Sequence, residues 1–210
     1  MATASEPRCS THSTDLGGRL IVVSGPSGVG KSTVVAALHR EHPFFFSVSV
    51  TTRRRRASER DGLDYRFVTE REFDALLGAG ELLEWAEYSG FRYGTPRAPV
   101  LSMLEGGNDV LLDIEVNGAM QVKTAFPAAV TIFVTPPSME TLEQRLRGRG
   151  DTEDEQIGLR LQIARWQLRE AIARFDHVVV NNSVETTVAE ILRILGDPPR
   201  EHTHDDATTR

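Results

Sequence analysis

At residues 25–32 the chain reads Gly25-Pro26-Ser27-Gly28-Val29-Gly30-Lys31-Ser32, a glycine followed after four residues by Gly-Lys-Ser. This spacing is typical of a phosphate-binding loop, whose glycines allow backbone N–H groups to point at phosphate oxygens. Lys31 supplies a positive charge for the β- and γ-phosphates, and the Ser32 hydroxyl can bind Mg²⁺. We therefore expect a nucleoside triphosphate site here, with a glycine-rich surface turn as the alternative.

The residues on either side of this loop favour a phosphate site. The apolar run at 20–23 is typical of a buried strand that enters the loop, and residues 33–38 are typical of a helix that leaves it. A strand, a loop and a helix in this order put a bound phosphate at the positive N-terminus of the helix.

Apolar runs and helical patterns alternate along most of the chain. Strands are predicted at residues 20–24, 45–50, 110–114, 130–134 and 178–180, and helices at 33–42, 116–126, 138–147, 152–175 and 185–195. The helix at 152–175 is expected to bury Trp166 and Phe175 in the core. This alternation indicates an α/β fold of the P-loop NTPase type, with a parallel sheet and helices on both of its faces.

Three segments depart from that alternation. Residues 51–98, rich in Arg, Glu, Tyr and Gly, are predicted to be an insertion at the carboxyl edge of the sheet, where open α/β folds bind ligands. Residues 1–18 and 197–210 are predicted to be a disordered leader and a flexible tail, because their composition cannot support a core. One domain is therefore expected over residues 19–196.

The composition argues against several classes of function. The net charge of −6 argues against a nucleic-acid binder, and no apolar run is long enough to span a membrane. The only cysteine, Cys9, lies in the predicted leader, so no internal disulfide can form. A cytoplasmic enzyme is expected. The sequence carries no signal for an oligomeric state.

Two further features are typical of phosphate chemistry. Asp113 follows the apolar run at 110–112, as in a Walker B strand, and can hold Mg²⁺ through water beside the phosphate-binding loop. Four arginines at 53–56 form a positive run directly after a predicted strand. A solvated loop or a nucleic-acid patch is the alternative, but one confined run in an acidic protein favours a phosphate clamp.

A second arginine group lies near a predicted helix end. Arg145 and Arg149 occur at the end of the helix at 138–147 and in the glycine-rich loop after it, and Arg160 follows in the next helix. A helix, a mobile loop and a helix that carry arginines suit a lid over polyphosphate. Ordinary surface arginines near helix ends are the alternative.

Several motifs in one order resemble those of the guanylate kinases, over about residues 20–195. They lie at residues 24–32, 47–53, 83–86, 93–95, 112–115, 145–150 and 180–181. The resemblance implies direct in-line transfer of the γ-phosphoryl group of ATP to GMP, and to dGMP, with Mg²⁺, in purine nucleotide metabolism. It makes residues 51–98 a GMP-binding lobe and residues 138–160 a helical lid, with ATP and GMP as the partners.

The resemblance also implies roles for individual residues, by motif position. ATP would be bound by Gly25, Pro26, Ser27, Gly28, Val29, Gly30, Lys31, Ser32 and Asn181, with Asn181 near the adenine. The GMP phosphate would be held by Arg53, Arg56, Tyr65 and Tyr93, and the guanine contacted or framed by Ser49, Glu84, Thr95 and Glu115. The catalytic residues would be Lys31, Asp113, Arg145, Arg149 and Arg160, with Ser32 and Asp113 at the metal.

The chain departs from the family pattern at three places. Arg55 and Ser58 stand where proline and glycine are usual, which leaves Arg54 and Arg55 without an assigned role. Glu115 stands where aspartate is common, and the leader is longer than the resemblance explains.

Two alternatives belong to other classes. A non-catalytic scaffolding module with a guanylate-kinase-like fold would have lost parts of the phosphate-binding loop and lid, whereas Lys31 and Asp113 are retained. A kinase for another nucleotide or a phosphorylated ribose would not need Glu84 together with Ser49.

Overall fold

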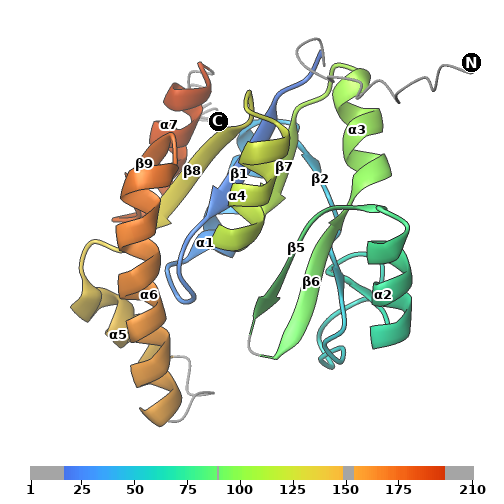
Figure 1. Cartoon of the computed structure of the whole chain (residues 1–210). Coiled ribbons are helices and arrows are strands. Elements are labelled where there is room, and N and C mark those ends of the chain that lie inside the picture. The colour runs from blue at the N-terminus through green and yellow to red at the C-terminus, as the bar shows by residue number, and fades with distance from the viewer. Residues whose placement is uncertain (1–16, 89, 149–153, 197–210) are drawn as a thin grey trace, which may run out of the picture.

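The computed structural model describes residues 17–88, 90–148 and 154–196 (Figure 1). Its strands are β1 (Leu20–Ser24), β2 (Phe45–Phe46), β3 (Val50–Thr51), β4 (Arg66–Phe67), β5 (Leu82–Tyr88), β6 (Phe91–Pro96), β7 (Val110–Asp113), β8 (Val130–Thr135) and β9 (His177–Val180). Its helices are α1 (Lys31–Glu41), α2 (Glu70–Gly78), α3 (Arg97–Glu105), α4 (Val116–Ala125), α5 (Met139–Arg147), α6 (Asp154–Arg174) and α7 (Val184–Leu195). Most of the predicted leader and the whole predicted tail lie outside the described residues.

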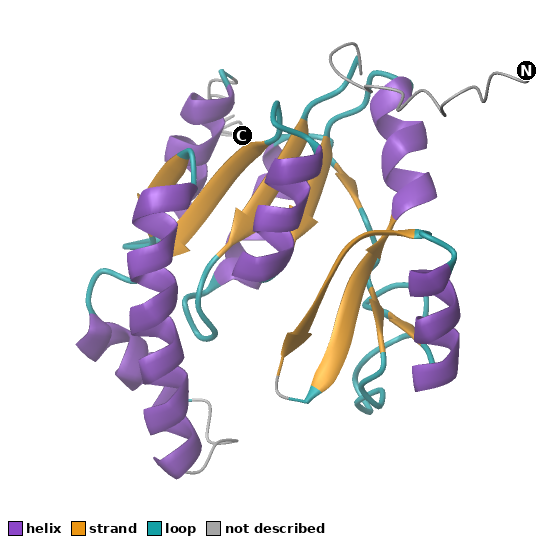
Figure 2. Ribbon diagram, in the orientation of Figure 1, coloured by secondary structure: helices purple, strands orange, loops and turns teal. Residues whose placement is uncertain are grey.

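The core is a parallel sheet with β1 at its centre. Within the described residues its strand order is β2-β7-β1-β8-β9, and each neighbouring pair is parallel. Helices lie on both sides of this sheet (Figure 2). The predicted α/β fold, a parallel sheet between two layers of helices, is therefore confirmed.

The central strand β1 shows how the core is built. Its side chains alternate, so Ile21 and Val23 pack with α1 and α7, whereas Leu20 and Val22 pack with α3, α4 and α6. All four side chains are buried. A strand that is covered on both faces needs a continuous apolar run, and this is the pattern that the sequence shows before the phosphate-binding loop.

Most of the predicted insertion folds as a second sheet, which we call the lobe. Within the described residues its strand order is β4-β3-β6-β5, with β5 and β6 as an antiparallel hairpin. Helix α2 packs Phe73 into a small core with Val50 and Leu82. Figure 1 shows the lobe beside the core sheet.

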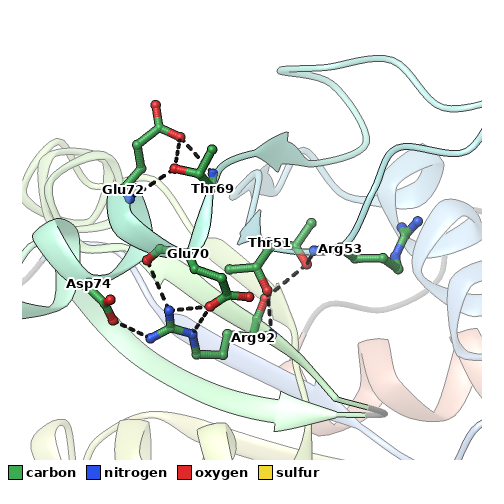
Figure 3. Close-up of polar contacts among 8 residues, drawn as sticks. Thr51, Arg53, Thr69, Glu70, Glu72, Asp74 and Arg92 are labelled. Atoms are coloured by element: carbon green, nitrogen blue, oxygen red, sulfur yellow. Dashed lines mark hydrogen bonds and ion pairs between the residues drawn. The ribbon is translucent and has the colours of Figure 1, made fainter.

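Arg92 of β6 fastens α2 to the lobe sheet (Figure 3). Its guanidinium carbon lies 4.6 Å from the centroid of the Phe73 ring. The same group donates to the Asp74 carboxylate at 2.6 Å and to the Glu70 carboxylate. One side chain therefore joins the edge of the hairpin to two turns of the helix that covers it.

One sequence prediction in this region is wrong, and three elements were missed. The strand predicted at 45–50 is two short strands in different sheets, because β2 pairs with β7 whereas β3 pairs with β4 and β6. An apolar pattern marks a strand but does not identify its partner. Helices α2 and α3 and strand β6 were not predicted, although Thr69 and Glu72 form the capping box that starts α2.

Helices α5 and α6 are the pair predicted to act as a lid. Leu142 of α5 packs against Ile157 and Leu161 of α6. The prediction that Trp166 is buried is wrong, because it lies on the uncovered side of α6 and is 43% exposed, whereas Phe175 is buried. No helix among the described residues, α6 included, is long and apolar enough to cross a membrane.

Candidate functional site

A cavity of about 420 Å³ lies between the carboxyl ends of β1 and β7 and the lobe. The predicted site residues that line it are Gly25, Pro26, Ser27, Gly28, Gly30, Lys31, Ser32, Ser49, Arg53, Arg56, Tyr65, Glu84, Tyr93, Asp113 and Glu115. The structure thus brings together most of the residues proposed for the two nucleotides, on a single cavity at the edge of the sheet where α/β folds bind ligands.

The phosphate-binding loop depends on two glycines. Gly28 and Gly30 have φ angles of 86° and 97°, in the left-handed region that favours glycine. A Cβ atom on Gly28 would also lie 2.7 Å from a methyl carbon of Leu146, because the loop packs closely against α5. Gly30 is the N-cap of α1, so the loop ends at the positive end of that helix.

Lys31 and Asp113 form an ion pair at the floor of the cavity. The Lys31 Nζ atom lies 2.8 Å from Asp113 Oδ1, and both side chains are largely buried. The pair forms because Asp113 is level with Val23 in the β1–β7 register, directly beside the loop. Burial lowers the pKa of Lys31, but the Asp113 and Glu115 carboxylates together raise it by more than burial lowers it. The net shift of the pKa is therefore upward, and the amine stays charged.

Arg53 is held by a carboxylate that the sequence analysis did not assign. Its guanidinium donates to the Glu59 carboxylate from both terminal nitrogens, at 2.7 Å and 3.1 Å. The Glu59 carboxylate also accepts from the Arg56 N–H at 2.8 Å, and the Arg53 guanidinium lies 5.5 Å from the centre of the Tyr65 ring. Hydrogen bonding to Arg53 holds the pKa of Glu59 below its usual value. These contacts hold the Arg53 side chain in place on the cavity wall, which Arg56 also lines.

Glu84 is a buried carboxyl group at the lobe end of the cavity. Its side chain is 5% exposed, and its Oε1 atom accepts a hydrogen bond of 2.6 Å from the Thr95 hydroxyl. Burial raises the pKa of Glu84 to about 7, and the Glu115 carboxylate adds to that rise. Thr95 is not among the residues that line the cavity, so it acts on the cavity through Glu84.

Tyr88 and Ala86 line the cavity but were not predicted. They lie on β5 at two-residue spacing from Glu84, so all three point to the same face of the strand. Of these three residues the sequence analysis assigned only Glu84, through a family motif, and the period of two along β5 was the signal that could have found the other two. Glu59 and Thr33 are further lining residues that it did not assign.

Arg145 and Asn181 support the phosphate-binding loop from behind and are not among the lining residues. Arg145 donates to the Val29 carbonyl at 2.8 Å and to the Asn181 carbonyl at 3.2 Å. The Asn181 Nδ2 atom donates to the same Val29 carbonyl at 2.7 Å, while its Oδ1 atom accepts from the Thr187 hydroxyl. The Val29 side chain is buried in the core beneath the loop.

The other two predicted lid arginines are Arg149 and Arg160. Arg160 is half-buried on α6 and is not among the lining residues, and Arg149 lies outside the described residues.

Comparisons with known proteins agree on one family. The model of the guanylate kinase family matches residues 17–197. A guanylate kinase from Synechocystis sp. is 48% identical over 185 residues, which cover 88% of this chain and 96% of the relative. A guanylate kinase from Thermobifida fusca is 52% identical over 181 residues, or 86% of this chain and 92% of the relative.

A solved structure agrees as well. The crystal structure of guanylate kinase from Anaplasma phagocytophilum matches with a TM-score of 0.71 and 36% identity, and the match covers 85% of each chain.

Proposed function

This chain belongs to the guanylate kinase family, and on that premise we propose that it transfers the γ-phosphoryl group of ATP to GMP, and to dGMP, in the cytoplasm, as a step of purine nucleotide metabolism. The observation that carries the proposal is one cavity with two unlike ends. A phosphate-binding loop forms one end and a buried carboxyl group, Glu84, forms the other, with Arg53 on the wall.

The loop end suits ATP. Its backbone and Lys31 would hold the β- and γ-phosphates at the N-terminus of α1, where helix and side-chain charges add. Lys31 would exchange part of its contact with Asp113 for a phosphate oxygen. Asn181, which holds the Val29 carbonyl, is proposed to lie near the adenine.

The residues beside Lys31 suit Mg²⁺. Ser32 and Asp113 both line the cavity, and hydroxyl and carboxylate oxygens are the hard ligands that this ion prefers. Mg²⁺ needs few protein ligands because it keeps several waters and binds substrate phosphates. When bound, it neutralises charge on the β- and γ-phosphates. Ser32 would ligate it directly and Asp113 through water.

The arginine clamp suits the GMP phosphate. Arg53 already makes a bidentate contact with a carboxylate, Glu59, and this fork geometry is the one that also binds phosphate. Arg56, Tyr65 and Tyr93 line the same wall and would complete the contacts.

The buried carboxyl group suits guanine. Guanine presents two adjacent donors, N1–H and the 2-amino group, and an ionised Glu84 can accept from both. Adenine presents an unprotonated N1 and no 2-amino group, so it would leave the buried carboxylate facing an acceptor. Thr95 fixes the Glu84 carboxyl, and Ser49 and Glu115 are proposed to frame the base.

The reaction requires positioning and charge neutralisation, and no covalent enzyme intermediate. The GMP phosphate oxygen attacks the γ-phosphorus in line, and it is already ionised near neutral pH, so no side chain has to remove a proton. Lys31 and the lid arginines Arg145, Arg149 and Arg160 are proposed to neutralise the transferring oxygens. Arg145 would have to leave its contacts behind the loop to do so.

An assay of ADP release across GMP, dGMP, AMP, CMP and UMP tests the proposal. We expect turnover with GMP and dGMP and very little with the others. Turnover with none of them would support a non-catalytic module, and a preference for another acceptor would support a related nucleotide kinase. Either result would overturn the proposed function.

A further inference from the structure

Gly118 on α4 stands against the carboxyl group of Glu84. A Cβ atom built on Gly118 would lie 2.0 Å from Glu84 Oε2 and 2.9 Å from the carboxyl carbon. Real Cβ atoms essentially never come within 3.0 Å of another heavy atom, so any side chain at this position would have to push the carboxyl away by at least 1 Å. The carboxyl group occupies the space that a side chain would fill.

Backbone conformation does not explain this glycine. Gly118 is the third residue of α4, in its first turn, and is not among the glycines with a positive φ angle. At a helical backbone position alanine is generally more favourable than glycine, so helix propensity would favour alanine at position 118. What remains to explain the glycine is the space beside Glu84.

The surroundings leave Glu84 little freedom to move. On the side of Oε1 the carboxyl is held by the Thr95 hydroxyl at 2.6 Å. The helix cannot withdraw easily either, because Gln121 of α4 is bonded in both directions to the backbone of Trp85 on β5. Its Oε1 accepts from the Trp85 N–H at 3.2 Å and its Nε2 donates to the Trp85 carbonyl at 2.6 Å. A side chain at position 118 would therefore displace the carboxyl group and not the helix.

We propose that Gly118 is a positioning residue for guanine specificity, because its missing side chain fixes where the Glu84 carboxyl can stand. The inference rests on the proposed function, in which that carboxyl accepts two hydrogen bonds from guanine. Both oxygens must face the base for this contact, and a shift of the Oε2 atom by an ångström breaks the pairing. Gly118 itself touches neither substrate nor phosphate in this account.

Gly118→Ala tests the proposal through substrate kinetics. We expect kcat/KM for GMP to fall by about tenfold or more through KM, as one or two hydrogen bonds weaken, with the KM for ATP nearly unchanged. Inosine monophosphate has the N1–H but lacks the 2-amino group, so its kcat/KM should fall less and the preference for GMP should shrink. Gly78→Ala is the matched control, because Gly78 ends α2 with nothing within 4 Å of a built Cβ atom.

Thermal midpoints give a second measurement that does not depend on activity. Gly118→Ala should lower the midpoint of the otherwise wild-type protein, because of the clash. In a Glu84→Ala background the same substitution should raise the midpoint, because the clash is gone and only the helix preference for alanine remains. If Gly118→Ala alone does not fold, the double variant should.

The outcomes separate the two proposals. The same midpoint shift in both backgrounds, or an unchanged kcat/KM for GMP in Gly118→Ala, would overturn the role of Gly118. A wild-type protein that does not phosphorylate GMP would overturn the proposed function, while the midpoint comparison would still report whether Gly118 and Glu84 compete for space.

Discussion

At the scale of single residues, two charged groups define the ends of the cavity. Lys31 is paired with Asp113 beside the phosphate-binding loop, and Glu84 is buried in the lobe with a hydroxyl partner. Their environments shift both pKa values upward. This shift keeps Lys31 charged, whereas it brings the pKa of Glu84 to about 7, so that Glu84 gains and loses its proton near neutral pH. The two groups therefore respond differently to mutation and to pH.

Lys31→Ala should leave a folded protein with almost no phosphoryl transfer. Loss of one such electrostatic contact in the transition state typically raises the barrier by about 3–4 kcal/mol. Steady-state assays of GMP phosphorylation, with the thermal midpoint as a control for folding, measure this. A variant that kept more than about a tenth of wild-type activity would show that the loop assignment is wrong.

Glu84 should make stability depend on pH. Its pKa is raised from 4.5 to about 7 in the folded state, so between these values the folded protein holds a proton that the unfolded chain releases. The contribution of Glu84 to the free energy of unfolding is therefore fully present below about pH 4.5 and is lost as the pH rises through about 7. Denaturation of wild type and of Glu84→Gln across this pH range measures how far their free energies of unfolding differ. If the two free energies changed with pH in parallel, the predicted contribution of Glu84 would be contradicted.

The same titration should appear in GMP binding. Guanine needs the ionised carboxylate as acceptor, so KM for GMP should fall as the pH rises through about 7. The GMP phosphate also titrates near neutral pH, but that change is shared by wild type and Glu84→Gln. Only the wild type should show the additional pH dependence of KM for GMP that comes from Glu84.

At the scale of elements, the phosphate-binding loop is held from behind by β9 and α7. Asn181 joins the Val29 carbonyl of the loop to the Thr187 hydroxyl at the start of α7. Asn181→Asp keeps the size but puts an acceptor against the Val29 carbonyl. An unsatisfied buried pair of this kind should cost about 1–3 kcal/mol of stability and raise the KM for ATP.

Asn182→Asp is the matched control for this change, because Asn182 is the exposed neighbour of Asn181. It should leave the thermal midpoint and the KM for ATP unchanged. Equal effects of the two substitutions would show that charge alone matters and that the loop does not depend on the Val29 contact.

The elements also show what the sequence could predict. The loop at 25–32, the strand before it and Asp113 could be predicted, because each is identified by a motif of residues that are neighbours in the sequence. The loop supports could not, because Arg145 and Asn181 reach Val29 across 116 and 152 residues. The two short strands at 45–51 were merged for a similar reason, since only their partners in different sheets separate them. Glu59 and Gly118 become visible only when their contacts are known.

At the scale of the whole molecule, the cavity lies between parts that we expect to move. Arg53 and Arg56 belong to the lobe insertion, and Arg145 is turned toward the back of the phosphate-binding loop. These groups can act on one set of phosphates only if the lobe and the α5–α6 pair approach the core. Small-angle scattering should therefore show compaction with GMP and an unreactive ATP analogue together. Unchanged dimensions with both ligands bound would indicate a preformed, rigid site.

The most direct test of the central claim is to measure kcat/KM for GMP and AMP in wild type and in Glu84→Gln. A site built on paired polar groups can reject an analogue that lacks the partner by about 10⁴ or more. We expect the wild type to prefer GMP strongly, and Glu84→Gln to lose most of its kcat/KM for GMP while the KM for ATP stays the same. Glu87→Gln, on the exposed side of the same strand, should behave as wild type. Near-normal GMP phosphorylation by Glu84→Gln, with AMP still rejected, would contradict the account.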